Sequence, residues 1–400
     1  MRQGRRRGPW VLAALAAAAA LALAALLALT PVPLWLVLQG GRSTIDDHRH
    51  FASQPIARAE TPSPLPATPA PLRWPGGLET AAAEADVAAH GTVALLVARR
   101  GQLVYERYFD GYTADRLTAV FSIAKSVVSL LLGMAIEEGS IAGVDEPVTR
   151  HLPELAAQDP RFAQVTLRHL LAMRSGIAFD EGYRSPTSDA ARFYLGTDLQ
   201  AEVARLRIER APNQIHKYQS GDTQLLGQVI ERATGLPLAR YAQQRLWRPL
   251  GAEFDASWST DAAGQARAFC CFNARPRDLL RLGLMVAAEG QWNGRRLVGA
   301  DWLRRSTAAM SGLPGPADPA WRNIERPHAP EAAFFAWHWR VRPLPGGPPL
   351  QPGPRVYAQG LHGQILLIDR DSQTVVLRLG RHQGGRHWPT WLDELVRLNP

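Results

Sequence analysis

The stretch FSIAKSVVSLLLGMAIEEGS, residues 121–140, combines an apolar helical pattern with a single lysine, Lys125. The pattern predicts a helix over residues 122–138 that ends at Gly139. The chain contains 45 lysines and arginines, yet only Lys125 and Lys217 are lysines. Because arginine supplies every other fixed positive charge of the side chains, a lysine here indicates a role that arginine cannot fill.

Ser122 precedes Lys125 by three residues, and this spacing places both side chains on one helix face about one turn apart. A serine hydroxyl becomes a good nucleophile when a neighbouring base takes its proton. A buried lysine can be that base, whereas arginine keeps its proton. The N-terminal end of a helix also favours an anionic oxygen. The pair therefore predicts a Ser-x-x-Lys nucleophile and base, and the alternative is a solvated helical serine and lysine.

Strand patterns lie on either side of the predicted helices. Residues 91–109 and 364–380 each contain two apolar, β-branched runs separated by a turn, which predicts two strand pairs. Amphipathic patterns that end in glycine predict helices within 165–177, 223–235 and 275–290. Strands at both ends with helices between them predict one mixed sheet built from both ends of the domain, with a helical insertion.

The second lysine, Lys217, precedes Tyr218 in the segment IHKYQSG. A cation beside a tyrosine eases the loss of the phenolic proton, so Tyr218 would relay a proton between the nucleophile and a leaving group. Ser220 would face the same cleft if this segment is extended or looped. The alternative is that Tyr218 belongs to the core and that Ser220 or Asp222 caps the next helix.

Three short motifs follow one another along the chain: SIAK (122–125), YQS (218–220) and the glycine pair in GLHG (360–363). In this order they resemble the motifs of serine β-lactamases and penicillin-binding-protein-like hydrolases. The class C-type branch, with its esterases and aminohexanoate-dimer hydrolases, is the most similar. The resemblance covers residues 80–395. It implies an α/β (α+β) fold in which helices flank a central, mostly antiparallel sheet and form a helical subdomain.

The resemblance also implies roles for individual residues. Ser122 matches the nucleophile, Lys125 its partner base, and Tyr218 the tyrosine of the second motif. The backbone N–H groups of Ser122 and Leu361 would form the oxyanion hole, in which paired donors stabilise a tetrahedral intermediate.

The third motif departs from the family pattern. AQGL (358–361) stands where K-T-G is usual and keeps only Gly360, which lets the backbone approach a substrate closely. A cation in this motif helps to hold a β-lactam carboxylate, and Ala358 cannot do so. His362 has two open roles, a donor in the site or part of the scaffold. The departure fits esterases and amide-oligomer hydrolases better than true β-lactamases.

The residues expected to contact the substrate are Ser220, Gly360, His362 and Trp339. Trp339 belongs to the aromatic run AFFAWHWRVRP, which would line an acyl pocket or pack into the sheet core. The loops 178–200 and 311–356 are expected to shape the pocket. His216, Asp180 and Glu181 would edge the cleft or, as charged loop residues usually are, be solvated. Metal and cofactor fingerprints are absent, so no metal or cofactor is expected.

Together these patterns predict a serine hydrolase that cleaves a small-molecule ester or amide, or a peptide, through an acyl-enzyme. Two alternatives stay open: a penicillin-binding-like β-lactamase or D-peptidase, and a catalytically inert sensor or scaffold of the same fold. The sequence does not choose among the substrates.

Residues 10–38 are almost wholly apolar, and four arginines lie within residues 2–7. About 20 apolar residues span a bilayer as a helix, and flanking arginines favour the cytoplasmic side. Residues 1–41 are therefore predicted to be a cytoplasmic basic tip and a single-pass transmembrane anchor, with the catalytic domain on the outer or periplasmic side. Secretion after cleavage of a signal peptide is the alternative.

Residues 42–76 are rich in proline and predict a semi-rigid linker, followed by the hydrolase domain at 77–400. The formal net charge is +9, but the arginines are scattered without interleaved aromatics, so no nucleic-acid partner is expected. Cys270 and Cys271 are the only cysteines. Since adjacent cysteines bridge only through a strained ring, two buried thiols are predicted.

Overall fold

The centre of the protein is an antiparallel sheet with the strand order β11-β12-β13-β14-β15-β2-β3. The computed structural model describes residues 9–29, 33–38, 41–183, 185–308, 334–343 and 352–400. The strands of this sheet are β2 (Thr92–Arg99), β3 (Gln102–Tyr108), β11 (Phe334–Phe335), β12 (Arg340–Pro343), β13 (Pro352–Gly360), β14 (Gln364–Asp369) and β15 (Thr374–Gly380). Leu377 of β15 lies opposite Leu96 of β2. The prediction of one sheet built from both ends of the domain is therefore confirmed, but its described strand pairs are all antiparallel, so the expectation of a mixed sheet is wrong.

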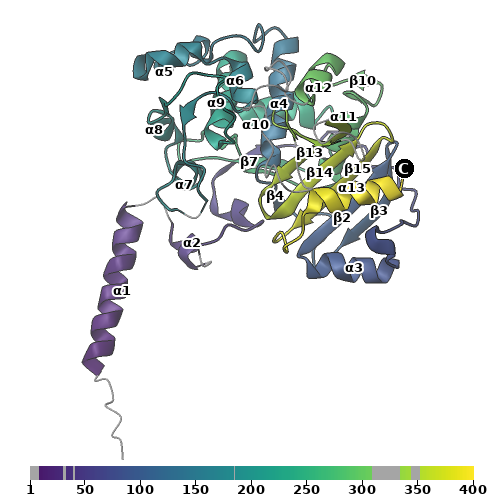
Figure 1. The fold of residues 1–400 in the computed structure, drawn as a ribbon, viewed down its shortest axis with the longest axis horizontal. Coiled ribbons are helices and arrows are strands. Elements are labelled where there is room, and N and C mark those ends of the chain that lie inside the picture. Colours follow the sequence, from purple (N-terminus) through teal and green to yellow (C-terminus); the bar gives the residue numbers. More distant parts are fainter. Residues whose placement is uncertain (1–8, 30–32, 39–40, 184, 309–333, 344–351) are drawn as a thin grey trace, which may run out of the picture.

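Helices cover both faces of this sheet (Figure 1). One face carries α3 (Thr80–Ala89) and α13 (Trp388–Leu398), and the other carries α4 (Ile123–Glu137) and α11 (Pro276–Ala287). Successive residues of β2 face the two layers, since Leu95 packs in one core cluster with Trp388 and Leu96 packs in the other with Val127. A sheet covered on both faces needs apolar residues at successive positions, which explains the continuous apolar run of β2.

Most of the remaining helices form a subdomain beside the sheet, as the family resemblance implies. They are α5 (Glu154–Gln158), α6 (Leu167–Leu171), α7 (Asp189–Leu195), α8 (Leu199–Val203), α9 (Ser220–Thr234) and α10 (Leu238–Ala242), while α12 (Ala300–Ser306) packs on α4. Helix α4 contacts both the sheet and α9, and its residues are buried from Ile123 to Ala135. This central position explains why the sequence of α4 is apolar on all sides.

The proline-rich segment packs on the domain and does not form a free spacer. Strand β1 (Ser53–Ile56) is the edge of a four-stranded sheet with β7 (Ala256–Ser259), β8 (Phe272–Ala274) and β4 (Thr118–Ala119). An edge strand tolerates proline because one side of it needs no ladder hydrogen bonds. Further along the segment, Leu103 N donates to Pro66 O at 2.8 Å and Thr68 N donates to Leu103 O at 2.9 Å. Residues 42–76 were expected to form a semi-rigid linker, whereas these parts of the segment pair with strands of the domain.

The N-terminal helix α1 (Pro9–Leu29) extends away from the rest of the protein, and a short helix α2 (Leu34–Leu38) follows it (Figure 1). Across the described residues, none of the helices combines the length and apolar character that a membrane crossing requires. The predicted transmembrane anchor, its membrane partner and the outward-facing localisation are therefore wrong. Alanine occupies 11 of the 21 positions of α1, and its methyl group offers much less apolar surface than leucine. The predicted basic tip lies outside the described residues.

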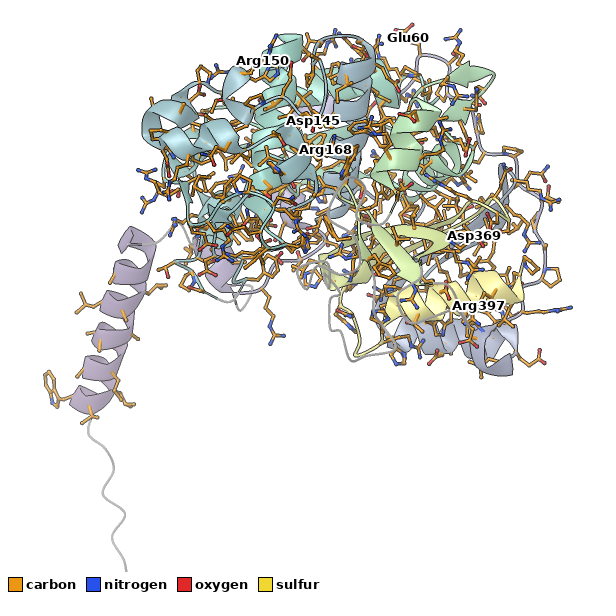
Figure 2. All side chains as sticks on the ribbon, turned by 45° about the horizontal axis from the view of Figure 1, so that its top comes forward. Glu60, Asp145, Arg150, Arg168, Asp369 and Arg397 are labelled. Atoms are coloured by element: carbon orange, nitrogen blue, oxygen red, sulfur yellow. A yellow bond between two sulfur atoms is a disulfide. The ribbon has the colours of Figure 1, made fainter. Side chains whose placement is uncertain are left out.

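Many of the arginines that make the chain basic are engaged within the fold. Arg168 forms a two-pronged ion pair with Asp145, at 2.8 and 2.7 Å, and Figure 2 shows the two labelled residues close together. The hydrogen bonds from Arg168 lower the pKa of Asp145. Arg378 is fully buried and donates to the backbone carbonyls of His362 and Gly363, both at 2.8 Å. Such pairing agrees with a structural use of arginine, and not with a basic binding face.

Candidate active site

Ser122 stands at the point where a strand turns sharply into the central helix. Strand β4 ends at Ala119, and Phe121 then adopts a left-handed conformation with φ of 50°. A bulky residue rarely adopts this conformation, and such residues concentrate at functional sites. Ser122 occupies the N-cap position of α4, but its side chain makes no capping hydrogen bond. The hydroxyl is therefore available for other contacts.

Lys125 makes three hydrogen bonds, and one of them is to this hydroxyl. Its Nζ donates to Ser122 Oγ at 3.0 Å, to Ser220 Oγ at 3.2 Å and to Phe269 O at 2.8 Å. The side chain is only 2% exposed. Three polar atoms surround Nζ, so the lysine has one defined position. The structure thus brings the first and second motifs together around one nitrogen.

Tyr218 lies beside the same lysine. The Nζ of Lys125 is 5.1 Å from the centre of the Tyr218 ring, and the Arg340 guanidinium is 5.3 Å from it. Both positions suit cation–π contacts. Lys217, the cation expected to act on Tyr218, instead forms an ion pair with Glu209 at 3.3 Å and is 40% exposed. The cations near the phenol are therefore Lys125 and Arg340, because the Lys217 side chain points to the surface.

Glu181 contacts the site, although a solvated loop position was the favoured expectation for it. Its carboxylate accepts from Ser220 N at 2.6 Å, Ser220 Oγ at 2.7 Å and the Tyr183 hydroxyl at 2.6 Å. The Lys125 ammonium, the Ser220 hydroxyl and the Glu181 carboxylate therefore form a continuous hydrogen-bonded chain. An acidic residue in a loop carries no sequence signal for this role, since the contact depends on how 178–188 folds against the start of α9.

Gly360 allows the end of β13 to pass close to the turn that holds Ser122. A Cβ atom at position 360 would lie 2.2 Å from Val120 O and 3.2 Å from Phe121 Cβ. Any larger residue would therefore push β13 away from the nucleophile. The next residue, Leu361, lines the same pocket as Ser122 and is 38% exposed.

Of the four expected substrate contacts, only Ser220 lines the pocket, whereas Gly360, His362 and Trp339 do not. His362 turns toward the N-terminal segment, where its Nε2 lies 2.8 Å from Ser43 O, and burial lowers its pKa. Trp339 is 1% exposed and packs in the main core. A tight turn in which Ala336 N donates to Trp339 O at 2.7 Å directs this tryptophan inward. His362 therefore has a scaffold position, and the aromatic run supplies sheet core.

The pocket beside Ser122 is mainly apolar and is assembled from distant parts of the chain. Helix α7 contributes one side, and the N-terminal segment contributes another. The lining residues are Leu36, Gly41, Ser43, Phe121, Ser122, Tyr183, Ala190, Ala191, Tyr194, Leu195, Ser220, Phe269, Cys270 and Leu361. The expected contribution of 178–200 is present, whereas most of the expected loop 311–356 lies outside the described residues. The part played by Leu36 was not foreseen, because residues 1–41 were predicted to stand apart from the domain.

Cys270 and Cys271 form a disulfide, so the prediction of two free thiols is wrong. Cys271 adopts a left-handed backbone conformation with φ of 62°. Both residues are 5% exposed, and Cys270 lines the pocket. The disulfide directly follows Phe269, whose carbonyl accepts the hydrogen bond from Lys125.

The family model described as Beta-lactamase matches residues 80–388. The chain belongs to the beta-lactamase family. It is 27% identical over 313 residues to the 6-aminohexanoate-dimer hydrolase of Paenarthrobacter ureafaciens, covering 74% of this chain and 75% of the relative. It is 32% identical over 185 residues to esterase EstB of Burkholderia gladioli, covering 40% and 45% of the two chains. These relatives and the family match identify a serine hydrolase.

The solved structures agree on the fold. A Bacillus anthracis protein assigned as a 6-aminohexanoate-dimer hydrolase superposes with a TM-score of 0.74 at 20% identity. The match covers 89% of this chain and 92% of that one. The beta-lactamase-like arrangement of an antiparallel sheet with flanking helices, predicted from the motif order, is therefore confirmed.

Proposed function

We propose that this beta-lactamase-family hydrolase cleaves an ester or a linear amide through an acyl-enzyme on Ser122. The observation that supports this most strongly is the 3.0 Å contact between Lys125 Nζ and Ser122 Oγ, at the wall of an apolar pocket. A nucleophile and its base must lie within about 2.6–3.2 Å for direct proton transfer.

In the first step, Ser122 Oγ attacks the substrate carbonyl carbon while its proton passes to Lys125. In its neutral form the lysine keeps two hydrogens for Ser220 Oγ and Phe269 O, and its lone pair accepts from the Ser122 hydroxyl. The backbone N–H groups of Ser122 and Leu361 hold the oxyanion of the tetrahedral intermediate. The close approach of Gly360 to Val120 supports this arrangement, since it brings the two peptide segments together. Donors fixed in this way stabilise charge as it develops.

In the second step, the leaving group needs a proton. We assign this step to Tyr218, whose ring centre lies 5.1 Å from Lys125 Nζ, with the proton taken from Ser122 returning through the phenol hydroxyl. The acyl group stays on Ser122 as an ester. Water then attacks this ester with the same groups acting as base and acid, which releases the acid product and restores the hydroxyl.

The pocket favours an uncharged acyl group. Leu36, Ala190, Leu195 and Phe269 are among its walls, and Ala358 of the third motif is a buried alanine that offers no cation. One relative is named a 6-aminohexanoate-dimer hydrolase and another an esterase, so the names point to a linear amide and an ester as the bond that is cleaved. We therefore place p-nitrophenyl alkanoates and linear amide dimers first among test substrates.

The test compares the wild-type chain with Ser122→Ala on p-nitrophenyl butyrate and on a linear amide dimer. The variant is expected to lose at least about a thousandfold in kcat. Ser129→Ala is a matched control on the same helix, because Ser129 Oγ is buried and has no hydrogen-bond partner among the described residues. Equal rates in wild type and Ser122→Ala would overturn the proposal, and loss in both variants would indicate damage to α4.

A further inference from the structure

The Cys270–Cys271 disulfide directly follows a hydrogen-bond acceptor of Lys125, and Cys270 is part of the wall of the pocket. Phe269 immediately precedes it, and the Phe269 carbonyl is one of the three acceptors of Lys125 Nζ. The Phe269 ring also lies against that ammonium, with 5.6 Å between Nζ and the ring centre. A displacement of this one segment would therefore change both the lysine and the pocket.

The backbone around the disulfide is tied to its neighbours on both sides. Cys270 N donates to Arg267 O at 3.2 Å, and Ser259 N donates to Cys271 O at 2.8 Å. The Phe269 carbonyl belongs to the same planar peptide as Cys270 N, and this peptide ends on the Cα atom of Cys270. The disulfide joins Cys270 to Cys271, whose own carbonyl accepts from Ser259 N, and so holds that end of the peptide. Cys271 is held at φ of 62°, a conformation that residues with a side chain rarely adopt without constraint.

We propose that the Cys270–Cys271 disulfide is a positioning element for Lys125, which fixes the Phe269 carbonyl in its hydrogen bond with Nζ. The ring formed by the two cysteines fixes the Cα atom of Cys270, and the hydrogen bond from Cys270 N to Arg267 O then orients the peptide that carries the Phe269 carbonyl. Cys270 and Cys271 act only through Phe269 and Lys125, so they are positioning residues. The inference rests on the proposed role of Lys125 as base.

The arrangement makes the hydrolase sensitive to reducing agents. A dithiol reductant attacks one sulfur as a thiolate and forms a mixed disulfide, and its second thiolate then expels the cysteine. One protein S–S bond is broken and two S–H bonds form, while the dithiol is oxidised to a cyclic disulfide. Cys270 lines the pocket beside Ser122, which gives a small reductant a route to this bond.

The experiment uses the full chain, reduced with dithiothreitol and freed of it by gel filtration without oxygen, because thiols themselves attack p-nitrophenyl esters. We expect kcat for p-nitrophenyl butyrate to fall about tenfold, the effect of losing one hydrogen bond to a charged group, while KM stays within about twofold. Reoxidation should restore kcat. A purely structural disulfide would instead change the melting temperature without this reversible fall in kcat.

The double variant Cys270→Ser, Cys271→Ser is the matched control, since these are the only cysteines of the chain. It should show the low kcat of the reduced protein and no response to the reductant, with a circular dichroism spectrum like that of the wild type. A wild-type kcat in the folded double variant would overturn the inference. Alkylation of both cysteines in unreduced, denatured protein would also overturn it. Activity in Ser122→Ala would instead overturn the proposed function.

Discussion

The reacting end of the site and the wall of the pocket are built in different ways. Ser122 and Lys125 lie three residues apart on one helix, so helix geometry alone brings them together. The wall combines Leu36, the helix α7 and Cys270, which are far apart in the sequence and meet only in the folded chain. Local spacing is visible in a sequence, whereas a wall assembled from distant segments is not.

Lys125→Arg should produce the largest effect on the reacting end. Arginine keeps the positive charge but does not act as a base, so kcat for p-nitrophenyl butyrate should fall about a thousandfold. Steady-state kinetics measures the loss. Lys217→Arg is the control, because Lys217 pairs with Glu209 at the surface and should leave kcat unchanged. A similar kcat in the two variants would show that Lys125 is not the base.

Gly360→Ala should produce the next largest effect. The added Cβ would lie 2.2 Å from Val120 O, so β13 must move away from Ser122 and the oxyanion donors separate. A displacement of about 1 Å at a reacting centre costs on the order of a hundredfold in kcat/KM. Gly143→Ala is the control, since a Cβ there meets nothing within 4 Å. An unchanged kcat/KM in Gly360→Ala would remove Leu361 from the proposed oxyanion hole.

Asp222→Asn should change how stability depends on pH. Burial raises the pKa of Asp222 to about 8, and its Oδ1 accepts from Ser175 and Gln219. Between the unfolded pKa of about 3.9 and the folded value, only the folded state keeps the proton. The free energy of unfolding therefore falls as pH rises through this range, by about 1 kcal/mol per unit from this group.

Denaturant unfolding at pH 5 and pH 7 measures this slope. Asp222→Asn keeps the Oδ1 acceptor but has no proton to lose. Its free energy of unfolding should therefore fall less steeply with rising pH than that of the wild type, by about 1 kcal/mol per pH unit. The exposed Asp371 provides the control, and Asp371→Asn should keep the wild-type slope. Identical slopes for wild type and Asp222→Asn would show that Asp222 is ionised in the folded protein.

Leu36→Ala should produce the smallest effect, and it concerns the wall. Leu36 is 9% exposed and lines the pocket, so its loss removes apolar contact with a long acyl chain. KM should rise a few-fold for p-nitrophenyl hexanoate and stay unchanged for the acetate. The reason is that each methylene of the acyl chain that is buried against Leu36 contributes up to about 0.8 kcal/mol to binding. Leu34→Ala is the control, because Leu34 is 50% exposed on the same helix. Equal KM changes for both esters would remove α2 from the acyl pocket.

The sequence was sufficient where a pattern has a single geometric meaning. The apolar runs of β2 and β15 predicted strands at both ends of the domain, and the structure pairs them. It was insufficient where tertiary contacts decide the outcome. Nothing in the sequence shows that Glu181 accepts from Ser220, or that Pro55 fits an edge strand opposite Ser257.

Two other expectations failed because each considered a segment in isolation. The apolar N-terminal run was treated as a membrane span by length, although α1 is mostly alanine and Leu36 packs beside the pocket. The two cysteines were treated as thiols on the ground of ring strain, although the surrounding segment holds Cys271 in the left-handed conformation that accompanies the disulfide in the structure.

The most direct test of the central claim is mass spectrometry of the wild-type chain, acid-quenched within its first turnovers of p-nitrophenyl butyrate. We expect one butyryl group on the peptide that contains Ser122, and a much slower appearance of this adduct in Lys125→Arg. A butyryl group on another residue, or product formation with Ser122 never acylated, would contradict the account.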